Sequence, residues 1–146
     1  MKKELLILAT LMIILLQLTT VTAEKIETNN TTIKVTINNQ QTTAQMIKNP
    51  TSDEFLQLLP LELELNDLFN REKYAELPTT LNSNSERTKT YEIGYIAYYP
   101  PTNSIAIYYD NDNQEIEEGI IPIAIINNTE MFKQNNTHVK IELITQ

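Results

Sequence analysis

The stretch YEIGYIAYYPPTNSIAIYYD, residues 91 to 110, holds six of the seven tyrosines and alternates apolar side chains on both sides of a Pro-Pro turn. Alternation with a period of two indicates strands that bury one face. We predict two strands, over 94 to 99 and 104 to 109, that form a hairpin. The stretch therefore favours a β fold in which some of the tyrosines pack inside.

Because successive side chains of a strand point to opposite faces, the side chains of this hairpin fall into two sets. The predicted inward set contains the isoleucines and two of the rings: Ile96, Tyr98, Ile105, Ile107 and Tyr109. The remaining set is our candidate ligand-binding surface beside the turn: Tyr95, Tyr99, Tyr108, Pro100 and Pro101. Because tyrosine combines an apolar ring with a polar tip, these residues suit the recognition of a small molecule or a peptide.

Strand patterns recur along the chain after residue 32. Further strands are predicted over 33–37, 41–48, 61–65, 72–75, 120–126 and 138–144. One short helix is expected from the capping pair Thr51 and Glu54 to Pro60, and a brief helical turn over 129–133. Residues 77–90 lack periodicity and indicate a surface loop. About eight short strands predict a mainly β fold, a closed antiparallel barrel with one or two capping helices.

Composition limits the classes of function. The 146 residues suffice for one domain with a hydrophobic core. A net charge of −8 without a basic cluster in the domain argues against a nucleic-acid partner. The chain has no cysteine, and its lone histidine, His138, is expected on an outer strand face as a surface residue. A thiolate site, a multi-histidine metal site and a histidine triad are therefore excluded, and we expect no metal and no cofactor.

Two acidic patterns resemble chemical sites. Asp110, Asp112 and Gln114 imitate the start of a calcium loop that lacks the required glycine and final glutamate. We favour a solvated hairpin loop over 110–118, with weak calcium binding as the alternative. Two glutamate pairs have no apolar flank that would equip them for acid–base catalysis, so we predict solvated faces and no catalytic residues. These pairs are Glu62 with Glu64 and Glu117 with Glu118.

The first 23 residues form a separate unit. Lys2 and Lys3 precede an apolar run from 5 to 18, and small residues end at Ala23. This order is typical of a secretory signal peptide that is cleaved after Ala23. An uncleaved N-terminal membrane anchor is the alternative. Both place the domain outside the cytoplasm, secreted or at the cell surface.

Residues 24–32 are polar and predict a disordered lead-in, so the domain is expected to span 33–146. Acceptor patterns for N-glycosylation begin at four asparagines: Asn29, Asn30, Asn127 and Asn135. The pattern is short and asparagine is abundant in this chain, so it leaves glycosylation open.

The run FLQLLPLELELNDLFNREKYAELPTTL from residue 55, followed by GYIAYYPPTNSIAIYYD from residue 94, resembles the small prokaryotic cyclophilin-like domain. That family carries a helix ending in Leu-Leu-Pro, an alternating leucine strand, a Glu-Lys and then a Leu-Pro pair, and a Gly-Asp-Ile-Ala-Tyr-Tyr hairpin. The positions that match in order and spacing are Leu58, Leu59, Pro60, Glu72, Lys73, Leu77, Pro78, Gly94, Ile96, Ala97, Tyr98, Tyr99 and Pro101. The resemblance extends from Ile33 to the C-terminus. It implies the closed eight-stranded antiparallel barrel of the cyclophilin-like superfamily.

The resemblance does not carry over prolyl isomerase activity. In true cyclophilins that activity depends on an arginine beside an apolar proline pocket, and no stretch here matches those motifs. The two arginines, Arg71 and Arg87, lie in a predicted turn and a polar loop. Tyr95 replaces the aspartate usual in relatives, and Thr102 and Asn103 stand where an aromatic residue and a glycine are common. Relatives therefore do not define a ligand.

Three functions follow from these observations. We favour an exported, non-catalytic binding or accessory module that holds a small ligand or a peptide on the barrel surface or at its mouth. The alternatives are a divergent secreted peptidyl-prolyl cis-trans isomerase and a cell-surface structural protein without a pocket. Membrane contact is expected only through the N-terminal segment, if that segment stays uncleaved.

Cleavage after Ala23 is open to a direct test. Produced with its own N-terminus in a secreting bacterium, the chain should leave the cytoplasm with Glu24 as its first residue, because a short apolar run precedes a small-residue site. N-terminal sequencing of the exported chain measures this. Ala23→Leu should block processing, and a wild-type chain that keeps Met1 in the membrane fraction would establish the anchor instead.

Overall fold

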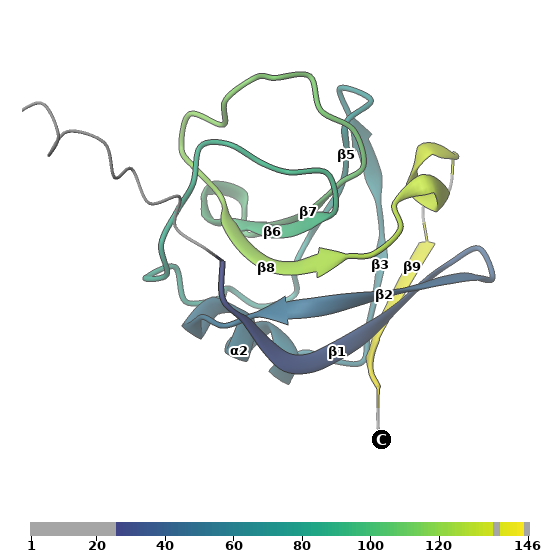
Figure 1. Cartoon of the computed structure of the whole chain (residues 1–146), viewed down its shortest axis with the longest axis horizontal. Coiled ribbons are helices and arrows are strands. Elements are labelled where there is room, and N and C mark those ends of the chain that lie inside the picture. The colour runs from purple at the N-terminus through teal and green to yellow at the C-terminus, as the bar shows by residue number, and fades with distance from the viewer. Residues whose placement is uncertain (1–25, 136–137, 145–146) are drawn as a thin grey trace, which may run out of the picture.

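The computed structural model describes residues 26–135 and 138–144, which fold as a β-barrel with one α-helix (Figure 1). The elements in chain order are β1 (Thr28–Ile37), β2 (Gln40–Ile47), α2 (Pro50–Gln57), β3 (Leu61–Glu64), β4 (Asn66–Leu68), β5 (Glu72–Glu76), β6 (Tyr95–Tyr99), the 3-10 helix η1 (Pro100–Thr102), β7 (Ser104–Tyr108), β8 (Ile121–Ile126), the 3-10 helix η2 (Glu130–Lys133) and β9 (His138–Leu143). The predicted mainly β, antiparallel barrel with short helices is confirmed.

One continuous segment joins the two ends of the sheet. The described strands form a single antiparallel sheet in the order β3-β9-β1-β2-β8-β6-β7-β5-β4. β3 pairs with β9 at one end of this order and β4 pairs with β5 at the other, yet only Leu65 separates β3 from β4. The described chain has nine strands instead of about eight, because the segment from 61 to 68 is interrupted at Leu65 and counts twice.

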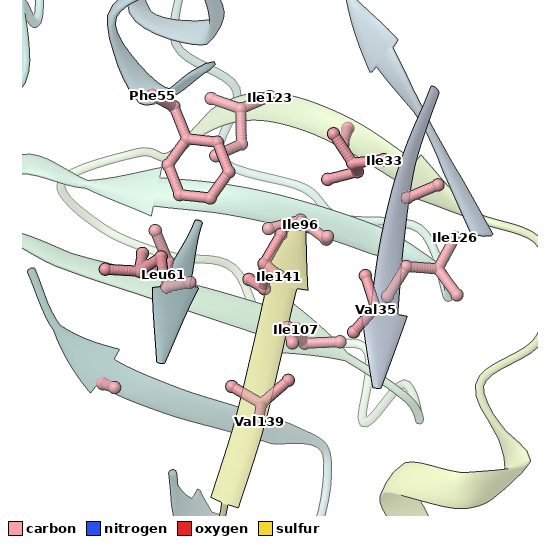
Figure 2. Close-up of a cluster of buried hydrophobic side chains, with 14 of the residues drawn as sticks. Ile33, Val35, Phe55, Leu61, Ile96, Ile107, Ile123, Ile126, Val139 and Ile141 are labelled. Carbon is pink, nitrogen blue, oxygen red and sulfur yellow. The ribbon is translucent and has the colours of Figure 1, made fainter. Parts of the chain in front are cut away.

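The inward faces of the strands fill the barrel with aliphatic side chains (Figure 2). Most strands contribute alternate residues, as their patterns predict, for example Ile33, Val35 and Ile37 of β1. The hairpin residues predicted to point inward are all buried in this cluster: Ile96, Tyr98, Ile105, Ile107 and Tyr109. The ring of Phe55 reaches from α2 into the same cluster, so the helix is held against the barrel by its apolar side (Figure 2).

Tyr98 shows how a buried tyrosine satisfies its hydroxyl group. The hydroxyl donates to Oδ1 of Asn103 at 3.0 Å and accepts the backbone N–H of Leu81 at 3.3 Å. Leu81 and Leu77 are themselves buried in the core. The predicted surface loop over 77–90 is therefore anchored at two leucines and does not lie free on the surface.

The domain begins earlier than the side chains indicate. β1 starts at Thr28, so residues 28–32, predicted to be a disordered lead-in before Ile33, form part of a strand. The backbone N–H of Lys48 donates to the carbonyl of Glu27 at 2.8 Å and extends this pairing further. The prediction is wrong here because main-chain hydrogen bonds hold the strand whatever the polarity of its side chains.

The start of α2 also differs from its prediction. Asn49 is the N-cap, and its Oδ1 accepts the backbone N–H of Ser52 at 2.9 Å. The predicted capping pair of Thr51 and Glu54 is wrong, because both side chains turn toward the loop over 77–90. The hydroxyl of Thr51 donates to the carbonyl of Asn82, and a carboxylate oxygen of Glu54 accepts the N–H of the same residue.

The predicted signal peptide over 1–23 and its cleavage site lie outside the described residues. Within the described ranges, no helix combines the length and apolar character needed to cross a bilayer. Of the four acceptor asparagines, Asn30, Asn127 and Asn135 are exposed and Asn29 is half-buried.

Gly94 and Gly119 both have a positive φ, of 101° and 73°, but they differ in the space around the missing side chain. A Cβ on Gly94 would lie 2.9 Å from the carbonyl oxygen of Ile126, whereas one on Gly119 would lie 3.2 Å from the Cβ of Arg87. Gly94→Ala should therefore lower the free energy of unfolding by about 2–4 kcal/mol through strain and a backbone clash. Gly119→Ala should lower it by about 1–2 kcal/mol. Chemical denaturation measures both, and equal losses would contradict the clash.

Candidate functional site

A second hydrophobic cluster, which is rich in tyrosine, lies on the outer face of the barrel. β6 and β7 present Ala97 and Ala106 there as a directly paired couple. Larger side chains surround these alanines: Tyr74, Tyr91, Tyr95, Tyr99, Tyr108, Ile116 and Ile120. Small residues among large ones leave a hollow on this face of the sheet.

We call this hollow the outer groove, and its volume is about 410 Å³. It lies over β5 and β7, between the β4–β5 turn, the end of η1 and a loop segment before β8. Its lining residues are Leu68, Phe69, Arg71, Glu72, Tyr74, Tyr99, Thr102, Ser104, Ala106, Tyr108, Glu115, Ile116 and Glu117. Aromatic and apolar groups thus line a site that also holds charged side chains.

Strand register explains the shape of the outer groove. Tyr74 on β5 lies opposite Ala106 of β7, and Tyr99 on β6 lies opposite Ser104 of the same strand. Directly opposed side chains on one sheet face stand next to each other. The small residues of β7 therefore form a floor with a tyrosine on either side.

A buried ion pair lies at one end of the outer groove. Nε of Arg71 donates to Oε2 of Glu72 at 2.9 Å, and Nη1 donates to both carboxylate oxygens of Asp112 at 3.1 Å. Arg71 and Glu72 are 7% and 6% exposed. Burial raises the pKa of Glu72, although the hydrogen bonds from Arg71 and Tyr108 act to lower it. Removal of either partner would leave a buried charge uncompensated, so the two residues act as one unit.

Two stacked tyrosines tie the 110–118 loop to the barrel. The rings of Tyr91 and Tyr108 stack with centroids 4.3 Å apart. The Tyr91 hydroxyl donates to Oδ1 of Asp112, and the backbone N–H of Asp112 donates to that hydroxyl at 3.2 Å. The hydrogen bond from Tyr91, helped by Arg71, lowers the pKa of the Asp112 carboxyl against the opposing effect of burial. The loop is exposed, as predicted, but Asp112 fixes it.

Phe69 lies at the rim of the outer groove in an unusual backbone conformation. Phe69 and Asn70 are the central residues of a tight turn, with φ of 56° and 52°. The β1–β2 turn has the same left-handed conformation and uses Asn38 and Asn39, a residue type that tolerates it. The Phe69 ring is 69% exposed, and the guanidinium carbon of Arg71 lies 5.1 Å from its centroid.

The predicted ligand-binding residues divide between the outer groove and its surroundings. Tyr99 and Tyr108 line the groove. Tyr95 is half-buried in the same outer cluster but does not line it. Pro100 and Pro101 form η1 beside the groove and do not line it either.

Sequence reasoning missed the rest of the lining, including Phe69, Arg71, Glu72 and Tyr74. The alternation within the predicted strand over 72–75 put Glu72 and Tyr74 on one face and could have pointed to both. Arg71 was placed correctly in a turn, but its burial depends on Asp112, which is 41 residues away in the chain. Local patterns carry no signal for such a pairing.

The other candidate sites have fewer features of a ligand-binding or metal site. A wider polar hollow of about 470 Å³ lies between Gln40, Gln41, Asn128, Glu130, Met131 and Gln134, without an aromatic wall. His138 is exposed as predicted, and its Nδ1 lies 2.9 Å from a carboxylate oxygen of Glu64. No three metal-ligating side chains gather anywhere in the described ranges. The outer groove is therefore the candidate functional site.

The fold and the groove define a small antiparallel β-barrel with an aromatic recess on its outer face. Comparison with known families matches residues 35–142 to the cyclophilin-like family, and the chain belongs to this family. The resemblance read from the sequence motifs is confirmed. No curated protein sequence matches the chain.

A solved structure supports the same fold. The solution structure of the hypothetical protein AF2241 from Archaeoglobus fulgidus superposes with a TM-score of 0.64. It covers 84% of this chain and 99% of its own chain at 15% sequence identity. At this identity the likeness shows the fold alone.

The contacts of the Asp112 carboxylate should make the conformation of the 110–118 loop depend on pH. Because the folded-state pKa of Asp112 lies below its ordinary 3.8, its hold on the loop is full above that pH and is lost as the pH falls through the lowered pKa. In an NMR titration, the Tyr91 ring and the Gln114 amide, which donates to Asp112, should shift with a midpoint below 3.8.

The matched variants are Asp112→Asn and Asp110→Asn, two changes of the same kind in one loop. Asp112→Asn should move the Tyr91 and Gln114 signals already at neutral pH, because it removes the charge that binds Arg71. Asp110→Asn should leave both signals in place. A wild-type midpoint at or above 3.8 would contradict the assigned contact.

Proposed function

We propose that this domain is an exported, non-catalytic binding or accessory module that seats a small ligand or a short peptide in the outer groove. The observation that carries the proposal is the groove itself, a recess of about 410 Å³ with aromatic walls, a small-residue floor and a few charged groups. Ligand sites typically combine mainly apolar linings with a few polar groups that orient the ligand.

The barrel interior offers no comparable site. Its aliphatic side chains and Phe55 are packed against one another, and in the described residues each buried polar side-chain atom has a hydrogen-bond partner. A ligand site is therefore better placed on the outer face of the barrel than in its interior. Export is supported by the signal-like N-terminus, in which Lys2 and Lys3 precede an apolar run that ends in small residues.

A divergent prolyl isomerase is the second candidate. One observation favours it: the guanidinium of Arg71 lies beside the aromatic lining of the groove, as an amide-polarising arginine would. Against it, Glu72 and Asp112 already bind that guanidinium. We therefore place the binding module first.

An exchange measurement separates the two candidates. The purified chain is mixed with a short peptide that contains a Xaa-Pro bond, and NMR follows both cis/trans exchange and the rings of Tyr99 and Tyr108. We expect no acceleration of exchange. Acceleration that is lost in Arg71→Lys but kept in Arg87→Lys would establish the isomerase instead.

Ligand binding at the groove is tested by filling it. Ala106 is 3% exposed on the groove floor, so Ala106→Leu should occupy the recess, whereas Ala106→Ser should preserve it. Compounds from a fragment library that shift Tyr99 and Tyr108 should lose at least about tenfold in affinity in the leucine variant and keep it in the serine variant. Fragments that bind all three chains equally would place the ligand elsewhere.

A further inference from the structure

The charges around the outer groove do not balance. Its charged lining residues are Arg71, Glu72, Glu115 and Glu117. Arg71 is already bound by Glu72 and by Asp112, so its charge is compensated twice. Neither Glu115 nor Glu117 forms an ion pair with a residue of the described chain. Two exposed carboxylates thus face the recess without a counter-charge.

The aromatic lining of the outer groove also favours a positively charged ligand. The face of an aromatic ring carries partial negative charge and attracts a cation that lies over it. Four such rings line the groove: Phe69, Tyr74, Tyr99 and Tyr108. One cation of the protein already uses this property, because Arg71 lies over the rings of Phe69 and Tyr91 at 5.1 Å and 5.3 Å.

Phe69 occupies its position against its own backbone preference. A bulky side chain in the left-handed region is strained, and strained residues concentrate where a ligand is bound. The β1–β2 turn shows that asparagine serves in this conformation elsewhere in the chain. The contact with Arg71 gives the Phe69 ring one structural role, and the 69% exposure of the residue leaves the ring accessible to a ligand at the rim.

We infer that the outer groove binds an organic cation, an ammonium group carried on an aromatic or apolar body. The body lies on the floor between Tyr74 and Tyr99, and the ammonium group lies toward Glu115 and Glu117. This inference rests on the proposed function, since it names the ligand class of that same groove. A free amine and the lysine side chain of a peptide present the same chemistry.

Matched probes test the charge directly. Phenethylamine, which is a cation at neutral pH, and 2-phenylethanol, its neutral analogue, are titrated into the purified chain while NMR follows the rings of Tyr99 and Tyr108. We expect the amine to bind about tenfold more tightly than the alcohol at low salt. A rise to physiological salt should narrow this ratio, because the carboxylates are exposed.

Variants of one loop provide the control. Glu115→Gln combined with Glu117→Gln should reduce the affinity for phenethylamine several-fold and leave that for 2-phenylethanol unchanged. Glu118→Gln, in the same loop but outside the groove lining, should change neither. Equal losses from both variants would show a diffuse effect of net charge and would overturn the proposed site.

Phe69→Asn separates a binding role from a structural one. The substitution should raise the midpoint of thermal unfolding, because asparagine accepts the left-handed turn, and should weaken the binding of phenethylamine. Leu143→Asn changes another exposed apolar residue, on β9, and should not alter binding. A Phe69→Asn chain that binds the amine as wild type does would remove the ring from the site.

The outcomes distinguish this inference from the proposed function. Equal binding of the alcohol and the amine in the groove would overturn the inference that the ligand is a cation and would leave the proposed binding module in place. No shift of Tyr99 or Tyr108 with either probe would overturn the cation inference, and the fragment library would then decide the binding module by itself. In a parallel arm, stronger binding of N-acetyl-phenylalanyl-lysine amide than of phenethylamine identifies a peptide as the source of the cation, and the reverse identifies a free amine.

Discussion

The segment from 61 to 68 is the constraint on which the rest of the structure depends, because its backbone pairs with β9 on one side of Leu65 and with β5 on the other. With the ends of the sheet joined in this way, a chain without disulfides encloses a continuous core. In the described residues that core is filled mainly with packed aliphatic side chains. The recess that we propose as a binding site therefore lies on the outside of the barrel, over the small residues of β7.

β5 carries charge on both faces of the sheet at neighbouring positions. Glu72 faces outward and binds Arg71, whereas the Nζ of buried Lys73 lies 3.0 Å from a carboxylate oxygen of Asp67. Burial acts to raise the pKa of Asp67, but hydrogen bonds from Tyr109 and Lys73 bring it below its ordinary value. The same strand is thus fixed from the core and from the groove. A change at one network is expected to reach the other through the backbone of β5.

Alternation predicted both faces of the β6–β7 hairpin, because the direction of a side chain on a strand follows from backbone geometry alone. The same signal failed at the start of β1, where polar side chains hide a strand held by its main chain. The capping pattern, a different signal, failed at α2, because Asn49 and Thr51 are both good caps and only the structure shows that Asn49 caps the helix. Two of the candidate tyrosines, Tyr99 and Tyr108, line the groove as alternation allowed. The charged residues at one end of the groove depend on the ion pair of Arg71 with Asp112, which joins segments far apart in the chain.

The order of the strands also has a consequence in time. β9 is the last of the described strands to be synthesised, yet it lies between β1 and β3, and Figure 1 shows this yellow strand beside the purple β1. Before Val139 and Ile141 emerge, β1 and β3 have unpaired edges and the core lacks one wall. A growing chain of this topology cannot close the barrel until β9 has been synthesised. The preceding strands therefore stay in an open sheet, and the barrel closes only when β9 joins it, an order that suits the export that we propose.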